Sequence, residues 1–414
     1  MRNIVKKTSA LLFALVFTAS LCSPAVIADD EYAIREGDYT SPREGSVIFG
    51  VEGTFVTITE TEKTQILARI NEIRKEACDE GVPKPGNRSV ALTPSDYVPI
   101  KWSEVIEKIA AMRAVESSVY IGHGRLAKDH TSVWDNNYGI RTNAENLAWN
   151  WNLPTVNAIL YGINQWYGEK SEWVEGGTGV TGHYTSMINP SMKYIGLSGF
   201  YNTSAAFYMT VTNQMSSGSG LSEDVAGVGG KTMQKVEADA SLITPTELTV
   251  NSATVKAGKT LEFVLRGEIS TNNGYASKGV GRIFTGVTWK SSDKDIATVD
   301  ENGVVTAKSA GKTNITANYG GSEFVREITV VQAGTVWGDA NGDGKVSSSD
   351  IVRLKKYFAA LDPDTGSSDV EVDPGADANG DGKLSSSDIV RLKKYFAALD
   401  PDTGTSSVTL GPDQ

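Results

Sequence analysis

The 414-residue sequence predicts a multidomain protein with an α/β domain, an all-β sandwich and a small all-α region. Three observations support this division. Two near-copies of one loop-and-helix segment lie close to the C-terminus, at 339–361 and 377–399. Seven short alternating runs of β-forming residues lie within 245–331 and predict strands. Helix-period runs at 61–77, 102–120 and 157–169 are mixed with strand-like runs between 61 and 215. At roughly 100–200 residues per domain, two to four domains are expected.

Changes in composition predict where these parts begin and end. Residues 216–231 (SSGSGLSEDVAGVGGK) are rich in Gly and Ser and lack a core-forming pattern, which indicates a linker. The expected segments are a signal peptide at 1–28, an N-terminal arm at 29–60, an α/β domain at 61–215, a Gly/Ser-rich linker at 216–244, a β-sandwich at 245–333, two loop–helix repeats at 334–402 and a tail at 403–414.

The first residues have the features of a secretory signal peptide. Basic residues at positions 2, 6 and 7 precede an apolar run at 10–21 that is too short to span a bilayer. Val26 and Ala28 stand at −3 and −1 before Asp29, the expected first residue of the mature chain. Cys22 suggests a lipoprotein as an alternative, but Leu21 fits poorly before a lipidated cysteine. We therefore expect an extracellular, secreted protein without a membrane span.

Cysteine content and charge exclude two further classes. After cleavage only Cys78 remains, so no intrachain disulfide can form in the mature chain. Removal of three basic residues with the signal peptide takes the formal net charge from −11 to −14. Nucleic-acid binding requires clustered Lys and Arg, which this acidic chain lacks, so we expect no nucleic-acid partner.

Each C-terminal copy begins with a loop rich in oxygen ligands. Candidate ligands stand at loop positions 1, 3, 5, 7 and 12, with Gly at position 6: Asp339, Asn341, Asp343, Lys345 and Asp350 in the first copy, and Asp377, Asn379, Asp381, Lys383 and Asp388 in the second. Carboxylate and carbonyl oxygens are the ligands that Ca²⁺ prefers, and the lysines would supply only their backbone carbonyls. Two bound Ca²⁺ ions are therefore predicted. Asp instead of Glu at position 12 leaves bidentate binding there open.

A helix follows each loop, but none precedes it, so the motif is not an EF-hand. Ile351, Leu354, Phe358 and Leu361 form one apolar stripe of helical period in the first copy. Loop-then-helix, twice, resembles a type I dockerin over about 336–402, and this resemblance implies Ca²⁺-dependent binding to a cohesin module of a scaffoldin in a cellulosome. It implies cohesin contacts at Ser348, Ser349, Lys355, Lys356, Ser386, Ser387, Lys393 and Lys394. A solvated lysine face is the alternative, and the duplication of the pattern favours binding.

Two histidines and two glutamates stand between the elements of the α/β domain. His123 and His183 are flanked by glycine, and Glu145 and Glu169 lie in AENLA and WYGE. Together with IKWS at 100–103, these motifs resemble the CAP superfamily (cysteine-rich secretory, antigen 5 and pathogenesis-related proteins, also called SCP-like) over about 62–215. The resemblance implies that His123, Glu145, Glu169 and His183 form a cleft tetrad, with His130 as the alternative to His123.

The tetrad residues leave several kinds of chemistry open. Two imidazoles and one or two carboxylates suit Zn²⁺ or another divalent ion. A carboxylate beside an imidazole can also orient it or act as general base, and the third alternative is a hydrogen-bonded cleft without chemistry. Catalysis by the tetrad is thus unproven. Five tryptophans are expected to lie mainly in the core, with a carbohydrate- or lipid-facing surface as the alternative: Trp134, Trp149, Trp151, Trp166 and Trp173.

The β-rich segment resembles a group 2 bacterial immunoglobulin-like domain, most clearly at 287–307 (VTWKSSDKDIATVDENGVVTA). That resemblance implies a spacer or an adhesive module. Two functions are therefore weighed. The first is a secreted component of a cellulosome-like complex that displays a CAP module and is associated with degradation of plant cell-wall polysaccharide. The second is a metal-assisted hydrolase, or a lipid- or carbohydrate-binding adhesion module, whose cleft takes a polysaccharide or peptide ligand.

Overall fold

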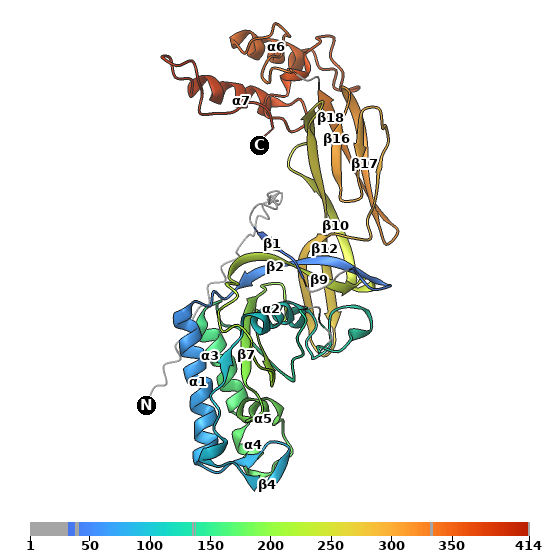
Figure 1. The fold of residues 1–414 in the computed structure, drawn as a ribbon. Coiled ribbons are helices and arrows are strands. Elements are labelled where there is room, and N and C mark those ends of the chain that lie inside the picture. The colour runs from blue at the N-terminus through green and yellow to red at the C-terminus, as the bar shows by residue number, and fades with distance from the viewer. Residues whose placement is uncertain (1–31, 38–40, 135, 137, 332–333, 413–414) are drawn as a thin grey trace, which may run out of the picture.

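A sheet covered by helices on both faces forms the first part of the molecule, shown at the bottom of Figure 1. The computed structural model describes residues 32–37, 41–134, 136, 138–331 and 334–412. The predicted signal peptide lies outside these residues. The central strands run in the order β2 (Ser46–Phe55), β7 (Tyr194–Tyr201), β8 (Met209–Ser216) and β6 (Ala144–Asn150). The helices are α1 (Glu60–Asp79), α2 (Glu104–Val119), α3 (Val156–Tyr167), α4 (Lys170–Glu175) and α5 (Gly182–Ile188).

Close packing against small residues explains the layers. In β7, a Cβ at Gly196 would lie 2.1 Å from the backbone nitrogen of Glu107, so glycine allows α2 to lie directly on the sheet. On the other face, α3 approaches β8 at Gly162. The apolar stripe of α1, from Ile66 to Ala77, is completely buried on that same face. The predicted α-β-α sandwich is confirmed.

The stretch assigned to a Gly/Ser-rich linker, residues 216–244, is not a free connector. Strand β9 (Gly230–Asp239) occupies its second half and pairs with β2 along ten consecutive residues. Strand β1 (Ala33–Arg35), from the expected N-terminal arm, pairs with β9 in parallel. The Gly- and Ser-rich composition concealed β9, because the strand itself (GKTMQKVEAD) follows the glycines. The other predicted domain limits stay predictions.

Two packed sheets form the predicted β-sandwich. One contains β10 (Ile243–Val250), β12 (Thr260–Asn272), β16 (Val304–Ala307) and β15 (Ala297–Val299). The other runs in the order β11 (Thr254–Lys256), β18 (Ser322–Val331), β17 (Gly311–Tyr319) and β14 (Thr288–Ser291). All seven predicted strands are present. Strands β11 and β13 (Ala276–Ile283) were not predicted.

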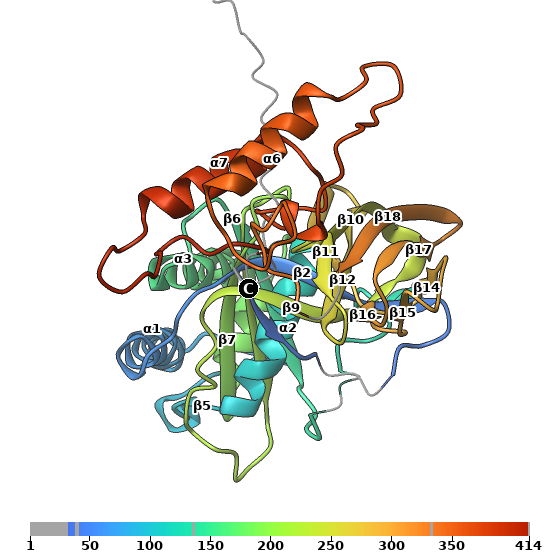
Figure 2. The same ribbon diagram turned by 90° about the horizontal axis from the view of Figure 1, so that it is seen from above.

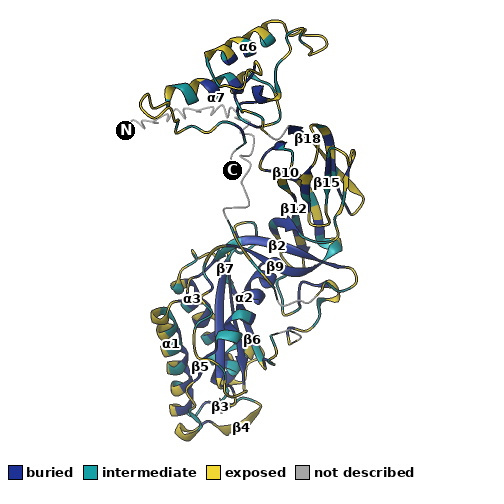
Figure 3. Ribbon diagram, turned by 45° about the horizontal axis from the view of Figure 1, so that its top comes forward, coloured by how far each residue is buried: buried dark blue, intermediate teal, exposed yellow. Residues whose placement is uncertain are grey.

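Strand β13 joins the sandwich to the α/β domain. The β12–β13 hairpin projects from the sandwich, and β13 pairs antiparallel with β2 at Gly281↔Val51. A Cβ at Gly281 would lie 1.6 Å from the carbonyl oxygen of Gly50, so only glycine permits this pairing. Figure 3 shows buried residues in β2, β9 and β12 around this junction. One core cluster contains Phe49 and Val115 of the α/β domain together with Phe263 of the sandwich.

The C-terminal region contains the two predicted loop–helix repeats. Helices α6 (Ser348–Ala359) and α7 (Ser386–Ala397) lie beside each other above the sandwich (Figures 1 and 2). Each begins with a capping box, Ser347 with Asp350 and Ser385 with Asp388. Their core is small, and alanines and leucines supply it: Ala340, Leu354, Ala376, Ala378 and Leu392.

Short elements complete the fold. They are the strands β3 (Pro83–Lys84), β4 (Asn87–Ala91) and β5 (Lys101–Trp102), and the 3₁₀ turns η2 (Pro94–Asp96), η3 (Lys128–His130), η4 (Ala240–Leu242) and η5 (Pro374–Ala376). Within the part of the chain that the structure describes, no helix has both the length and the apolar character needed to cross a membrane.

Candidate functional site

His123 and Glu145 are paired in the α/β domain. Strand β6 carries Glu145, and the loop after α2 carries His123, whose Nδ1 lies 2.8 Å from Oε1 of Glu145. A carboxylate facing Nδ1 favours the tautomer in which Nδ1 holds the proton and Nε2 is an acceptor. The Glu145 side chain is 1% exposed, whereas His123 is 58% exposed. The pair therefore anchors an accessible imidazole on a buried charge.

Arg113 on α2 compensates the buried carboxylate. Its guanidinium donates to Glu145 at 2.8 Å and to Glu116 at 2.5 Å, and it reaches the backbone carbonyls of Gly122 and Gly124 on both sides of His123. Burial alone would raise the pKa of Glu145, but Arg113 and His123 outweigh it, so the pKa is lowered. Glu145 is consequently a fixed carboxylate at neutral pH.

His183 and Glu169 form a second pair, built around a helix N-terminus. Oε2 of Glu169 accepts the backbone N–H groups of His183 and Tyr184 in the first turn of α5, at 3.0 and 3.1 Å. Its Oε1 lies 2.5 Å from Nδ1 of His183. A carboxylate at a helix N-terminus satisfies amides that have no partner within the helix. Glu169 thus holds both the backbone and the ring of His183.

The two imidazoles share one cavity of about 660 Å³. Their ring centroids are 6.3 Å apart, and Glu145, His130, Trp134 and Ser186 also line the cavity. Neither Nε2 atom forms a hydrogen bond with a residue that the structure describes. The structure therefore brings the four predicted residues together as two His–Glu pairs.

A metal ion in this cavity would find two imidazole nitrogens. Each carboxylate is engaged on Nδ1, where it orients the ring, as carboxylates do behind metal-bound histidines. Within the described ranges, no group of three or more His, Cys, Asp or Glu side chains is arranged to hold a metal ion. The two free Nε2 atoms fit a site with open coordination positions, and a site in which the carboxylates also bind the metal does not follow from this geometry.

The remaining candidates in this domain divide between cavity wall and core. His130 stacks on Tyr120 with ring centroids 4.0 Å apart, and its Nδ1 contacts the carbonyl of Arg125, so it lies beside the cavity without a carboxylate partner. Trp166 and Trp173 are buried as expected, and Trp149 is half-buried. Trp134 and Trp151 are exposed, by 37% and 67%, and do not belong to the core.

The first repeat loop wraps around two buried carboxylates. Asp339 accepts the N–H groups of Gly342 and Gly344 at 2.7 Å each. Asp350 accepts those of Ala340 and Asn341 through Oδ1 and that of Ser347 through Oδ2. Loop positions 1 and 12 are thereby drawn toward the loop interior, as an ion-binding loop requires. Asn341, Asp343 and Lys345 are exposed on its rim.

The second loop repeats most of these internal bonds and, in addition, has a partner from the β-sandwich. Asp377 accepts from Gly380 and Gly382, and Asp388 accepts from Asn379 and Ser385. Asp381 and Lys383 are exposed. Burial raises the pKa of Asp377 and raises that of Asp388 to about 6.

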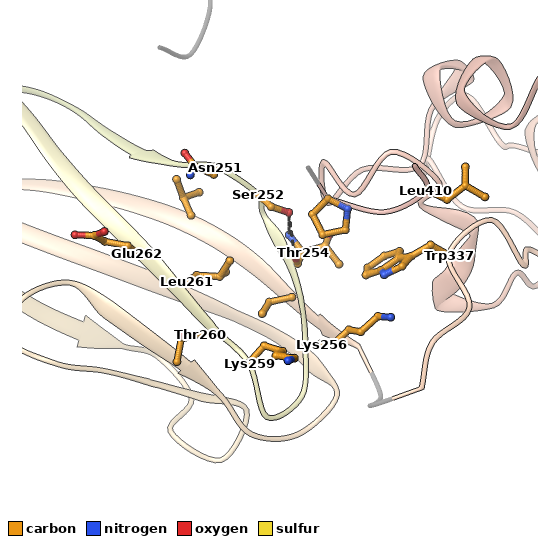
Figure 4. A pocket seen from close by; sticks show the side chains of 13 residues that line it. Asn251, Ser252, Thr254, Lys256, Lys259, Thr260, Leu261, Glu262, Trp337 and Leu410 are labelled. Carbon is orange, nitrogen blue, oxygen red and sulfur yellow. Dashed lines mark hydrogen bonds between the residues drawn. The ribbon is translucent and has the colours of Figure 1, made fainter. Parts of the chain in front are cut away.

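That partner is the segment from Ser252 to Thr254, which ends at the first residue of β11. Thr254 Oγ1 donates to Oδ2 of Asp377 at 2.8 Å, and Ser252 Oγ donates to the carbonyl of Gly380 at 2.6 Å. A cavity beside this contact is lined from the sandwich by Lys256 and from the repeat region by Trp337 and others (Figure 4). The two nearly identical loops therefore differ in their surroundings.

The residues predicted to contact a partner all lie at the surface. They occupy the first turn and the second half of each helix, and every one is exposed: Ser348, Ser349, Lys355, Lys356, Ser386, Ser387, Lys393 and Lys394. Val352 and Val390, between the serines and the lysines, are 50% and 48% exposed. Each helix thus presents an apolar centre with polar groups on both sides.

Fold and sites together define a modular protein that ends in two loop–helix repeats. Three family models match the chain. The cysteine-rich secretory protein (CAP) family matches 67–213, the bacterial Ig-like domain (group 2) matches 242–330, and the dockerin type I domain matches 337–397. The chain therefore contains a CAP domain, an Ig-like domain and a dockerin. Dockerins in general bind Ca²⁺ and cohesins, and proteins that contain them are typically extracellular components of cellulosomes.

Individual proteins resemble only parts of the chain. Ice-binding protein 1 of Shewanella frigidimarina is 27% identical over 168 residues, which are 37% of this chain and 19% of that protein. The chain thus spans about a fifth of that relative. Venom allergen-like protein 4 of Schistosoma mansoni is 17% identical with a TM-score of 0.26, and the match covers 41% of this chain and 98% of the other. BmVAL-1 is 14% identical with a TM-score of 0.27, and the match covers 41% of this chain and 82% of the other.

Sequence reasoning did not find Arg113 or Thr254. Arg113 occupies a position on the helical period of α2, which made it a candidate for the core face, and only its burial between two glutamates reveals its role. Thr254 precedes Asp377 by more than a hundred residues, and no local pattern links them.

Proposed function

We propose that this protein is a secreted component of a cellulosome, which docks through Ca²⁺-dependent binding of its dockerin to a cohesin and thereby displays its CAP domain. Its setting would be the degradation of plant cell-wall polysaccharide. The dockerin carries this proposal. Both loops draw the carboxylates of positions 1 and 12 inward, and both helices expose the same serine and lysine pattern.

Calcium would provide the energy that orders the repeats. Four acidic or amide side chains per loop lie close together, and the apolar core beneath them consists of a few alanines and leucines. Without the ion, the repulsion between carboxylates opposes folding, so metal binding supplies folding free energy. The two ions would occupy the loops at 339–350 and 377–388.

Docking is tested with the mature chain and an immobilised type I cohesin. We expect binding in Ca²⁺ and loss of binding in EDTA. Replacing both Asp339 and Asp377 by Ala should abolish binding, whereas either change alone should leave the other copy available. The matched control is Asp362→Ala, in the exposed turn after α6. Binding of the double variant at wild-type affinity would refute the docking proposal.

A second function is favoured by the two His–Glu pairs. Both Nε2 atoms share one cavity while the carboxylates hold Nδ1, an arrangement suited to binding a divalent cation or to proton transfer. On this basis we infer a CAP cleft that acts as a metal-assisted hydrolase or binds a polysaccharide or peptide. A Zn²⁺ ion there would be held by His123 and His183, and it would polarise a substrate or water when bound.

This second function is tested on the mature chain with Ca²⁺ kept in excess, so that the dockerin stays loaded. Zn²⁺ titration of the wild type is compared with that of His183→Ala and of His130→Ala, the cavity histidine without a carboxylate partner. Turnover of glycan and protein panels is measured in parallel. Loss of Zn²⁺ uptake and of turnover in His183→Ala, with both unchanged in His130→Ala, supports the proposed function of the cleft. Equal Zn²⁺ uptake in all three and no turnover would leave display as the function.

A further inference from the structure

The tip of the β12–β13 hairpin, which belongs to the Ig-like domain, contacts the end of α2 in the CAP domain. Thr271 Oγ1 donates to the carbonyl of Val119, and Ser277 Oγ donates to that of Ser118 at 2.5 Å. Asn273 Nδ2 donates to the carbonyl of Ile121. Three side chains of the Ig-like domain thus bond to backbone carbonyls in the last turn of α2 and in the loop that follows it.

These bonds complete the C-terminus of α2. The last carbonyls of a helix have no partner within it and must find one elsewhere. Trp149 of the CAP domain donates to the carbonyl of Ser117, at 3.0 Å. The next ones, at 118 and 119, accept from the hairpin, and both donors are buried. A buried carbonyl without a partner destabilises the fold, so the bonds define where the helix ends.

The chain continues from this helix end directly to His123. Ile121 is held by Asn273, and Gly122 and Gly124 are held by Arg113, so the loop is attached at both sides of His123. Arg113 also holds Glu145, the partner of the His123 ring. Gly122 has a φ of +158°, in an extended path that the surrounding bonds maintain. The ring itself is largely exposed.

We infer that Thr271, Asn273 and Ser277 are positioning residues for His123, so that the Ig-like domain completes the cleft of the CAP domain. Their donors fix the backbone of 118–121, and the backbone places the His123 ring on Glu145. The glycines of β13 allow this approach: a Cβ at Gly279 would lie 2.9 Å from Val51 and 3.2 Å from Val119. The inference rests on the proposed function of the CAP cleft, because it makes the hairpin a support of that cleft.

The second histidine pair provides an internal control. His183 and Glu169 are held by α4, α5 and β6, and no residue of the hairpin contacts them. Loss of the hairpin donors should therefore change His123 and leave His183 as it is. The chain has three histidines in total, so ¹⁵N spectra of histidine-labelled protein resolve each ring. Nδ1–H and Nε2–H tautomers have distinct ¹⁵N shifts.

The experiment uses the mature chain at a pH where the rings are neutral. In the wild type we expect His123 and His183 both as Nδ1–H tautomers. In the triple variant Thr271→Val, Asn273→Ala, Ser277→Ala, the His123 signals should move toward the Nε2–H form, while the His183 signals stay unchanged. Asn272→Ala, the exposed neighbour on the same hairpin, is the control and should match the wild type. A variant with Thr271→Ser and an unchanged Ser277 keeps both hydroxyl donors. Its His123 signals should therefore match those of the wild type.

An unchanged His123 tautomer in a folded triple variant overturns the inference, because the loop would then hold itself. A change in both histidines overturns it as well, since the hairpin would then support the whole domain and not this loop. Neither result depends on a ligand, metal or turnover. Failure of the proposed cleft function would instead leave the tautomer difference intact, so the two failures are distinguishable.

Discussion

Arg113 is the residue on which the buried charges of the CAP domain depend, and Arg113→Met tests this directly. Methionine keeps much of the side-chain length and removes the charge. The change deprives Glu145 and Glu116 of a buried cation and the carbonyls of Gly122 and Gly124 of their donor. Removing one partner of a buried ion pair costs about 3–5 kcal/mol, because the other charge remains buried. Arg125 still bonds Glu116, which keeps the expected loss within this range.

Urea unfolding followed by tryptophan fluorescence measures this loss. Six of the eight tryptophans lie between 102 and 173, so the signal reports mainly on the CAP domain. With an m-value of roughly 3 kcal/mol per molar, the midpoint should fall by about 1–2 M. The control is Lys75→Met, whose ion pair with Asp79 is 60% and 49% exposed and should leave the midpoint unchanged.

The pH dependence gives this prediction a second test. The pKa of Glu145 is lowered in the wild type, so the pair contributes stability above the unfolded-state pKa and loses it as pH falls through the folded-state value. In Arg113→Met the unpaired carboxylates favour protonation. The difference in unfolding free energy between wild type and variant should therefore narrow from pH 7 toward pH 4, near the unfolded-state pKa of Glu. A loss of unfolding free energy below about 1 kcal/mol, or a stability difference that does not change with pH, would refute the reasoning.

Three further predictions follow. Thr254→Val removes the hydroxyl that orients Asp377, so calorimetry should show Ca²⁺ affinity falling about 10-fold at one of two sites; equal affinities at both would contradict this. Burial raises the pKa of Glu107. The stability of the wild type relative to Glu107→Gln should therefore decline as the pH rises above the unfolded-state pKa, by up to about 1.4 kcal/mol per pH unit. Parallel stability profiles of the two proteins, from thermal melts at stepped pH, would contradict this. Gly281→Ala forces a methyl group against the Gly50 carbonyl, so limited proteolysis should cut between the CAP and Ig-like domains; an uncut chain would show that the strands adapt.

The sequence predicted those parts of the fold whose pattern is local. The stripe of α1 and the two repeat loops each lie within a short segment, so spacing and ligand chemistry were sufficient. Seven strands of the sandwich were found for the same reason. The β12–β13 hairpin was missed although Asn272-Asn273-Gly274 is a turn signal, because β13 (ASKGVGRI) contains glycines that weaken its strand pattern. Those glycines allow β13 to approach β2 closely, and no local pattern reveals that pairing.

The candidate site shows the same limit. Resemblance supplied the four tetrad residues, and spacing alone does not tell which nitrogen faces which carboxylate. The structure answers this with two Nδ1 contacts, and it shows that Arg113 and the hairpin donors hold the loop of His123. Such supports come from residues distant in sequence. They depend on how the sheet and helices meet, which emerges only in the folded chain.

The shared core has a consequence for how such a protein can be rearranged. Phe49, Val115 and Phe263 pack in one cluster, and β2 is bonded both to its own domain and to β13. A cut at the boundary between the two family matches would expose apolar surface on both sides. Recombination or engineering that swaps one of these domains alone should therefore yield insoluble products. The CAP and Ig-like domains therefore form one packed unit, whereas the dockerin has its own small core and contacts the sandwich through residues such as Ser252 and Thr254.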